Sequence, residues 1–158
     1  GNEIQLMSTF EGLPEETVTF LAEDCEFTPS HPATLIRWIK AVIEEETHQL
    51  SFVNFIFCSD EYLHRLNVEY LSHDTLTDVI TFPYASPPQV EGDIFISIDR
   101  VRENARELSL AFDDELHRVM IHGVLHLCGY TDKDASARQT MTDRENKALT
   151  LLQTYLSA

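Results

Sequence analysis

Hydrophobic positions along the chain of 158 residues follow two different periods. After Pro32, apolar residues recur at three-and-four spacing, which predicts a helix with one buried stripe. The stripe consists of Leu35, Trp38, Ile39, Val42 and Ile43. Ser51–Cys58 is dense in Phe, Val and Ile and too short for a typical helix, so it predicts a buried strand. The acidic run Glu44–Glu46 then reads as the solvated end of the helix.

The same signals place the remaining elements. Two short strands are expected at 4–10 and 17–22, and two more at Asp78–Phe82 and Gly92–Ile98, joined across the turn-rich SPPQVEG as in a hairpin. Helices are expected from Ser59–Asp60 through Tyr70, from a cap at Asp99 to about Leu108, from Asp113–Asp114 through Leu127, and over Ser136–Tyr155. Strands come early and helices late, which predicts an α+β or three-layer arrangement. A chain of this length buries one sizeable core, so residues 1–158 are expected to form a single domain.

The charge balance limits the partners of the protein. The formal net charge is −16, from 27 acidic and 11 basic residues, which argues against broad attraction to polyanions. Any contact with nucleic acid must therefore be local. The best candidate for a basic stripe is Arg102 and Arg106, with Arg100 before them, but the interleaved Glu103 and Glu107 favour an ordinary solvated helix face.

The sequence indicates a cytoplasmic protein without a membrane span. No apolar run approaches the roughly 20 residues that cross a bilayer, and no basic-then-apolar leader is present. The cysteines Cys25, Cys58 and Cys128 stand in dissimilar settings without a CxxC pair. We expect them to be reduced core thiols without a chemical role.

The candidate metal-ligating residues lie in the stretch IHGVLHLCGYTDKD, residues 121–134. His122 and His126 stand four apart in an apolar-striped helix, so their imidazoles project from adjoining turns of one face and can hold one metal ion. Gly129 stands where the helix should end, because glycine adopts the left-handed conformation without a Cβ clash. Asp132 then returns toward the histidine pair.

Two nitrogens and one carboxylate leave at least one coordination position open, which is the composition of catalytic rather than structural zinc sites. Asp134 is an alternative third ligand. The competing interpretation is that His122 and His126 are partly buried helix residues and that Asp132 is an ordinary turn residue. The helix end at Gly129 favours the metal site, because the chain can reverse there and bring Asp132 back to the two histidines that stand four residues apart.

The motif lacks the glutamate of the metalloprotease pattern HExxH, since Gly123 occupies that place. A standard peptidase mechanism therefore loses its general base. A glycine in mid-helix costs roughly 1 kcal/mol relative to alanine. Its presence suggests a close approach by another backbone or by substrate.

Three segments together resemble one protein family. HGVLHLCGYTD resembles the HGxLHLxGYDH signature of the YbeY-type endoribonucleases. Upstream, LNVEYLSHDTLTDVITFPY at 66–84 resembles their LNxxYRxKDxPTDVLSFP segment, and Glu91–Ile94 resembles their GDI strand. The likeness spans 66–132 in the same order and with compatible spacing, which no single short match achieves.

The resemblance implies a compact α+β fold, with helices packed on a small mixed sheet and a Zn²⁺ site on an HxxxH helix. It implies metal-dependent hydrolytic cleavage of single-stranded RNA, in maturation of the 16S rRNA 3′ end and in ribosome quality control. The implied partners are ribosomal RNA and the ribosomal subunit, with neither DNA nor membrane. The family's first two metal histidines fall on His122 and His126, and the third falls on Asp132. A carboxylate is an ordinary zinc ligand, although this donor set also suits iron or manganese.

A second departure concerns phosphate recognition. Leu71 occupies the place of the family arginine and offers neither charge nor hydrogen bond to a phosphoryl oxygen. Arg118, one turn before His122, is the expected catalytic substitute, although pairing with Asp114 or Glu115 is the commoner outcome for such an arginine. His73, where the family often has lysine, is a further candidate cation.

The expected catalytic residues are His122, Arg118 and Asp93. A metal-activated water needs no protein base, so Asp93 is assigned an orienting role, as is Asp78 unless it only caps a turn. Two rival functions remain open: a metal-dependent hydrolase of peptides or small molecules, with a base such as Glu91, and a ribosome assembly factor whose metal is mainly structural.

Overall fold

The computed structural model describes residues 17–71 and 77–158, so the strand expected at 4–10 and the candidate His73 lie outside the described residues. The described chain forms four strands and five helices. The strands are β1 (Thr17–Ala22), β2 (Gln49–Cys58), β3 (Val79–Pro83) and β4 (Gln89–Ser97). The helices are α2 (Pro32–Glu45), α3 (Asp60–Leu71), α4 (Ile98–Leu108), α5 (Phe112–Leu127) and α6 (Ala135–Leu156).

The strands form one mixed sheet in the order β1-β2-β4-β3. β1, β2 and β4 are parallel, whereas β3 is antiparallel to β4 and pairs Phe82 with Asp93. The predicted α+β fold and the hairpin are therefore confirmed, with β4 beginning at Gln89 rather than at Gly92. Within the described chain, β3 is an edge strand.

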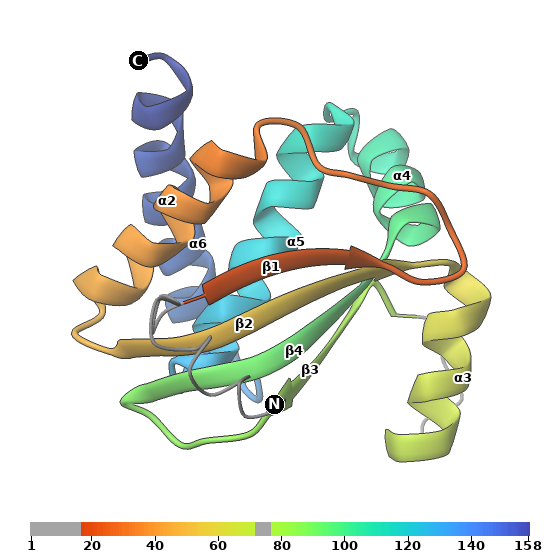
Figure 1. Ribbon diagram of the computed structural model, residues 1–158, viewed down its shortest axis with the longest axis horizontal. Coiled ribbons are helices and arrows are strands. Elements are labelled where there is room, and N and C mark those ends of the chain that lie inside the picture. The colour runs from red at the N-terminus through yellow and green to blue at the C-terminus, as the bar shows by residue number, and fades with distance from the viewer. Residues whose placement is uncertain (1–16, 72–76) are drawn as a thin grey trace, which may run out of the picture.

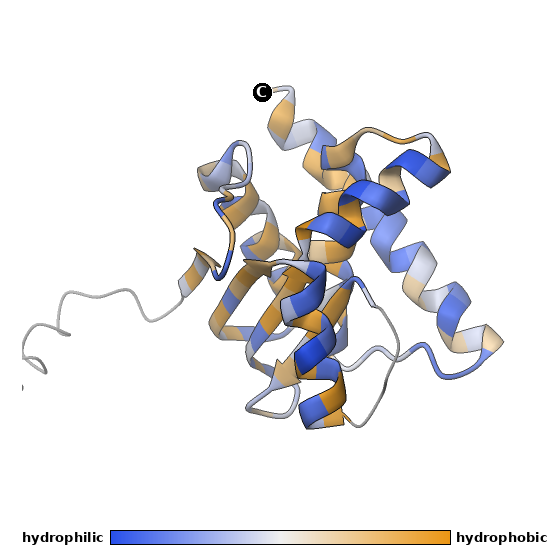
Figure 2. Ribbon diagram, turned by 90° about the vertical axis from the view of Figure 1, so that its right-hand side faces the viewer, coloured by the Kyte–Doolittle hydropathy of each residue, from blue (hydrophilic) through white to orange (hydrophobic). Residues whose placement is uncertain are grey.

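Helices cover the two faces of the sheet unequally. α2, α5 and α6 lie on one face, and the main core fills the space between them and the strands (Figure 1). α3 lies against the other face, where Leu63 packs with Cys58 and Ile80. The strands are largely hydrophobic, whereas α6, which ends at the C-terminus, exposes mostly hydrophilic residues (Figure 2). None of the helices in the described part of the chain has the length and apolar character of a membrane span.

The helix boundaries agree with the predictions to within a few residues, except for the cap of α4. Ser97, not Asp99, is the N-cap, because its hydroxyl accepts a hydrogen bond from the backbone N–H of Arg100. Asp99 lies in the first turn, where its negative charge suits the helix dipole. The prediction was wrong by two residues because Ile98, the expected last residue of the strand, already belongs to the helix.

The arginines of α4 are engaged by acidic neighbours. Arg102 faces Asp99 at 3.9 Å, and Arg106 faces Glu103 at 2.5 Å, both one turn apart on the same helix. This arrangement agrees with a solvated helix face rather than with a stripe for nucleic acid. The three cysteines are free thiols, and Cys58 and Cys128 are buried.

Gly123 marks a close approach between α5 and the sheet. A Cβ at this position would stand 2.8 Å from Cγ2 of Ile94 on β4. The expected approach by another backbone or by substrate was therefore wrong, because the neighbour is a core side chain. This contact brings α5 against the strand that pairs with the β3 edge.

Gly92 gives a stability prediction. A Cβ there would lie 2.6 Å from the carbonyl oxygen of Phe82 and 2.8 Å from Cδ2 of Leu127, and the backbone of the paired strand cannot move aside cheaply. Gly92→Ala should lower the free energy of unfolding by about 1–3 kcal/mol in urea denaturation. Gly123→Ala is the comparison, because the nearest atoms to its added Cβ belong to the Ile94 side chain rather than to backbone, and alanine gains about 1 kcal/mol of helix propensity, so it should lose less stability than Gly92→Ala. Equal losses in the two variants would contradict this steric account.

Candidate metal centre

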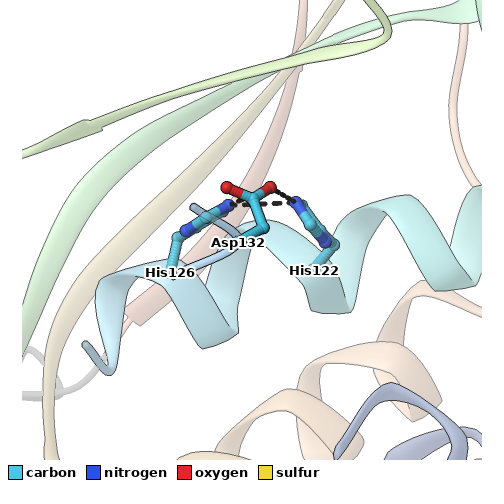
Figure 3. Close-up of side chains that lie close together, drawn as sticks. All are labelled: His122, His126 and Asp132. Atoms are coloured by element: carbon cyan, nitrogen blue, oxygen red, sulfur yellow. Dashed lines mark hydrogen bonds and ion pairs between the residues drawn. The ribbon is translucent and has the colours of Figure 1, made fainter. Parts of the chain in front are cut away.

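Two imidazoles from α5 and one carboxylate from the following loop converge at one point (Figure 3). The Nε2 atoms of His122 and His126 are 3.0 Å apart. Asp132 Oδ2 lies 3.7 Å from Nε2 of His122 and 3.6 Å from Nε2 of His126. Three ligand atoms held by a tetrahedral zinc ion at about 2.0–2.2 Å stand about 3.3–3.6 Å apart. The spacing observed for the three atoms brackets this range.

The second ring nitrogens determine which atoms face the centre. His122 Nδ1 lies 2.6 Å from Oε2 of Glu145, and His126 Nδ1 lies 2.9 Å from the backbone oxygen of Tyr130. A carboxylate and a carbonyl only accept hydrogen bonds, so both Nδ1 atoms carry the proton. Each neutral ring then directs the lone pair of Nε2 toward the other ring. Two lone pairs this close repel each other unless a proton or a metal ion lies between them, and together with the Asp132 carboxylate the donor set fits a metal ion.

The pKa values of the two histidines diverge. Burial lowers the pKa of His122, but the hydrogen bond and charge of Glu145 outweigh it, so the pKa lies above its ordinary value. Burial and the neighbouring His122 bring the pKa of His126 below its ordinary value. Nε2 of His126 is therefore the more readily available lone pair.

Glu145 is a site residue that the sequence analysis missed. It lies on α6, is buried, and hydrogen-bonds His122 through one oxygen. Its other oxygen accepts from Arg118 Nη1 at 2.8 Å, and Nη2 of Arg118 donates to Oδ1 of Asn146 at 2.9 Å. Arg118 therefore pairs across to α6 and not with the acidic first turn of its own helix. A buried carboxylate behind a ligating histidine fixes the tautomer and orientation of the ring.

The loop that carries Asp132 is held by contacts of Tyr130 with Glu46 and Arg144. Gly129 takes the expected positive φ of 104° directly after the helix. The Tyr130 hydroxyl donates to Oε1 of Glu46 at 2.7 Å, and Arg144 lies over the Tyr130 ring and 3.6 Å from Oε2 of Glu46. Glu46 was expected to be solvated, and this was wrong, because the residue anchors the loop.

Asp134, the alternative third ligand, is engaged elsewhere. Its side chain accepts from the backbone N–H of Ala137 at 2.8 Å and caps α6. The cluster formed by His122, His126 and Asp132 does not include it. The sequence left open whether Asp132 or Asp134 is the third candidate ligand, and the structure places Asp132 with the histidines.

The three candidate ligands line a pocket of about 740 Å³. Its other walls are the end of α3 with Asn67 and Leu71, the segment 77–81, Pro83, and the loop after α5. Burial raises the pKa of Asp78, which lies in this wall. None of the described residues lining the pocket is a lysine or an arginine.

Comparison with known proteins identifies the family. The family model described as Endoribonuclease YbeY matches residues 20–153, most of the chain. The chain belongs to the YbeY family. Proteins named Endoribonuclease YbeY from Amoebophilus asiaticus and Bacteroides thetaiotaomicron are 47% and 44% identical to it. The matches each cover 85% of this chain, and 92% and 98% of the respective relatives.

A further YbeY relative and one solved structure agree with this assignment. The Endoribonuclease YbeY of Flavobacterium johnsoniae is 43% identical over 81% of this chain and 92% of its own length. The solution structure of TM1509 from Thermotoga maritima superimposes with a TM-score of 0.65 at 28% identity, covering 89% of this chain and 91% of the other. The sheet and helices described above are therefore shared with a solved protein.

Two acidic residues with expected roles lie away from the candidate metal ligands. Asp93 accepts from Asn54 Nδ2 at 2.9 Å and from the Tyr84 hydroxyl at 2.7 Å. Neighbouring Ile94 faces α5, so Asp93 and Glu91 point to the opposite face of the sheet because strand side chains alternate. The structure therefore does not bring Asp93 to the histidine pair, and Glu91 is not placed as a base.

Proposed function

We propose that the chain is a metal-dependent endoribonuclease that cuts single-stranded RNA, with ribosomal RNA on the ribosomal subunit as its substrate. Maturation of the 16S rRNA 3′ end and ribosome quality control are the proposed setting. The observation that carries the proposal is the convergence of two imidazole lone pairs and the Asp132 carboxylate in a pocket open to solvent. Membership of the YbeY family supports RNA as the substrate class.

His122, His126 and Asp132 would hold the metal, and we propose zinc, which these donors suit. Bound there, a divalent ion supplies Lewis-acid polarisation of a phosphodiester oxygen and a lowered pKa of water. Glu145 holds Nδ1 of His122 in its protonated form, and the backbone oxygen of Tyr130 does the same for His126. The chain thus keeps both Nε2 atoms available for the ion.

We assign Arg118 a positioning role. Glu145 and Asn146 each accept a hydrogen bond from one terminal nitrogen of its guanidinium, which holds Arg118 toward α6, and Arg118 is not among the residues that line the pocket. Asp78 is the acidic residue of the pocket wall that is available to orient a water, since Asp93 lies on the other face of the sheet.

Removal and restoration of the metal test this function. Protein stripped by a chelator should lose cleavage of a single-stranded RNA fragment that contains the 16S 3′ end, and added Zn²⁺ or Mn²⁺ should restore it. A duplex of the same sequence serves as the control and should remain intact. Cleavage that survives complete removal of the metal would refute the proposal.

A structural metal in a ribosome assembly factor is the second candidate. Leu71 and the lack of lysine and arginine among the described pocket residues favour it. The two functions separate if purified wild-type protein with its own metal fails to cut single-stranded ribosomal RNA, while a His122→Ala variant still supports ribosome maturation in cells. That result would favour the assembly factor. A peptidase is disfavoured because Gly123 replaces the glutamate of HExxH.

A further inference from the structure

The pocket that holds the candidate ligands runs along the edge of the sheet. Five consecutive residues, 77–81, all line it. Successive strand side chains point to opposite faces, so a pocket that touches the consecutive β3 residues Val79, Ile80 and Thr81 follows the strand's backbone edge rather than one face. The far wall of the same pocket contains His122, His126 and Asp132.

The hydrogen bonds between β3 and β4 show which backbone groups of β3 are used within the sheet and which point outward. Tyr84 N–H donates to the oxygen of Glu91, and Ser97 N–H donates to the oxygen of Asp78, so even-numbered residues of this segment bond to β4. In an antiparallel pair the alternate residues direct their N–H and C=O groups outward. The outward residues of β3 are therefore Val79, Thr81 and Pro83.

Of the three outward residues, only Val79 and Thr81 offer a hydrogen-bond donor, because Pro83 has no N–H. Proline is tolerated at such a place since its missing N–H costs no ladder bond. The N–H groups of Val79 and Thr81 point away from β4, both residues line the pocket, and no strand of the described chain pairs with this edge. Thr81 lies opposite Ile94, so its side chain also faces α5.

The N–H groups of this edge are candidates to bind phosphate in place of the arginine that the family has at Leu71. The chain carries a net charge of −16, and the pocket offers no guanidinium or ammonium group among its described lining residues. Backbone N–H groups bind phosphate oxygens without carrying charge, and such contacts read no sequence. They suit a substrate that is recognised as a single strand.

We propose that a single-stranded RNA lies along the β3 edge and that the N–H groups of Val79 and Thr81 donate to its backbone phosphate oxygens beside the metal ligands. The inference rests on the proposed function, since it names the substrate contacts of that same pocket. An extended peptide would also pair with a free edge, through both N–H and C=O groups. RNA is favoured because the chain belongs to the YbeY endoribonuclease family and lacks the HExxH glutamate.

Thr81→Pro removes one outward N–H without breaking a ladder bond, and Thr81→Val is the matched control that loses the hydroxyl but keeps the donor. Stopped-flow anisotropy with labelled single-stranded RNA gives the Kd before cleavage. Thr81→Pro should weaken binding about tenfold and equally for RNAs of different sequence, while Thr81→Val stays near wild type. Metal content and the urea midpoint are measured in parallel, and Val79→Pro replaces Thr81→Pro if the latter does not fold.

Several outcomes overturn the inference. These are equal Kd values for the proline and valine variants, a tenfold loss confined to one RNA sequence, and binding of an extended peptide in place of RNA. If wild-type protein binds RNA through Thr81 but never cuts it, the proposed function fails while the edge contact stands.

Discussion

Protein carrying His126→Ala should lose its metal and its RNA cleavage together. Wild-type protein purified without chelator is expected to hold about one divalent ion per chain, and the variant should hold almost none. The reason is that Nε2 of His126 is one of the two nitrogen ligands in the cluster found among the described residues, and its ring is fixed by the backbone oxygen of Tyr130. Elemental analysis of the untreated protein, with a cleavage assay on the same sample, measures both losses.

The matched control is His31→Asn, at an exposed histidine outside the ligand cluster. His31 has a φ of 56°, a conformation that asparagine adopts more readily than most residues, so the backbone should be preserved. This variant should keep its metal and its activity. Full metal occupancy in His126→Ala would remove the basis of the metal assignment.

The second large effect is expected from a residue that touches no metal. Glu145→Gln should weaken metal binding about 10- to 100-fold, the range found when an outer carboxylate behind a ligating histidine is lost. The amide can turn its NH₂ group toward His122, which favours the tautomer with the proton on Nε2 and removes that lone pair from the site. Competition against a chelator gives the affinity, and the visible spectrum of Co²⁺-substituted protein reports the ligand geometry.

Asn146→Ala provides the comparison for Glu145→Gln. It removes the other contact of Arg118 but leaves the bond between Glu145 and His122 intact. Metal affinity and the Co²⁺ spectrum should therefore match wild type. If Glu145→Gln binds metal as tightly as Asn146→Ala, the carboxylate only holds α6 against α5.

Local patterns identified the elements and part of the centre. The periodic stripe after Pro32 predicted α2, and all five of its members are buried. The spacing of His122 and His126 is a property of helical geometry alone, and Gly129 ends the helix through its own conformational freedom. Each of these features depends on neighbours within a few residues, which is the range over which sequence periodicity carries information.

Partners from distant segments escaped the sequence analysis. Glu145 stands 23 residues beyond His122 on another helix, and nothing in its local pattern distinguishes it from the solvated glutamates of the chain. Glu46 is the last residue of the acidic run at the end of α2, and it accepts a hydrogen bond from Tyr130, 84 residues away in the chain. Both became buried or half-buried only because α2, α5 and α6 pack together on the sheet (Figure 1).

The positions of Arg118 and Asp93 also depend partly on the local sequence and partly on the packing of distant segments. The sequence placed Arg118 one turn before His122, but the packing of α6 decided that its guanidinium is taken by Glu145 and Asn146. Strand alternation put Asp93 and Ile94 on opposite faces, but only the docking of α5 decided which face carries the candidate metal ligands. By itself the sequence determined the helices, the strands, the metal-ligand motif and the family resemblance, because these arise from short-range geometry and side-chain chemistry. The tertiary structure alone decided which carboxylate supports the ligands, which is turned away, and which strand edge borders the pocket, because these depend on contacts between segments far apart in the chain.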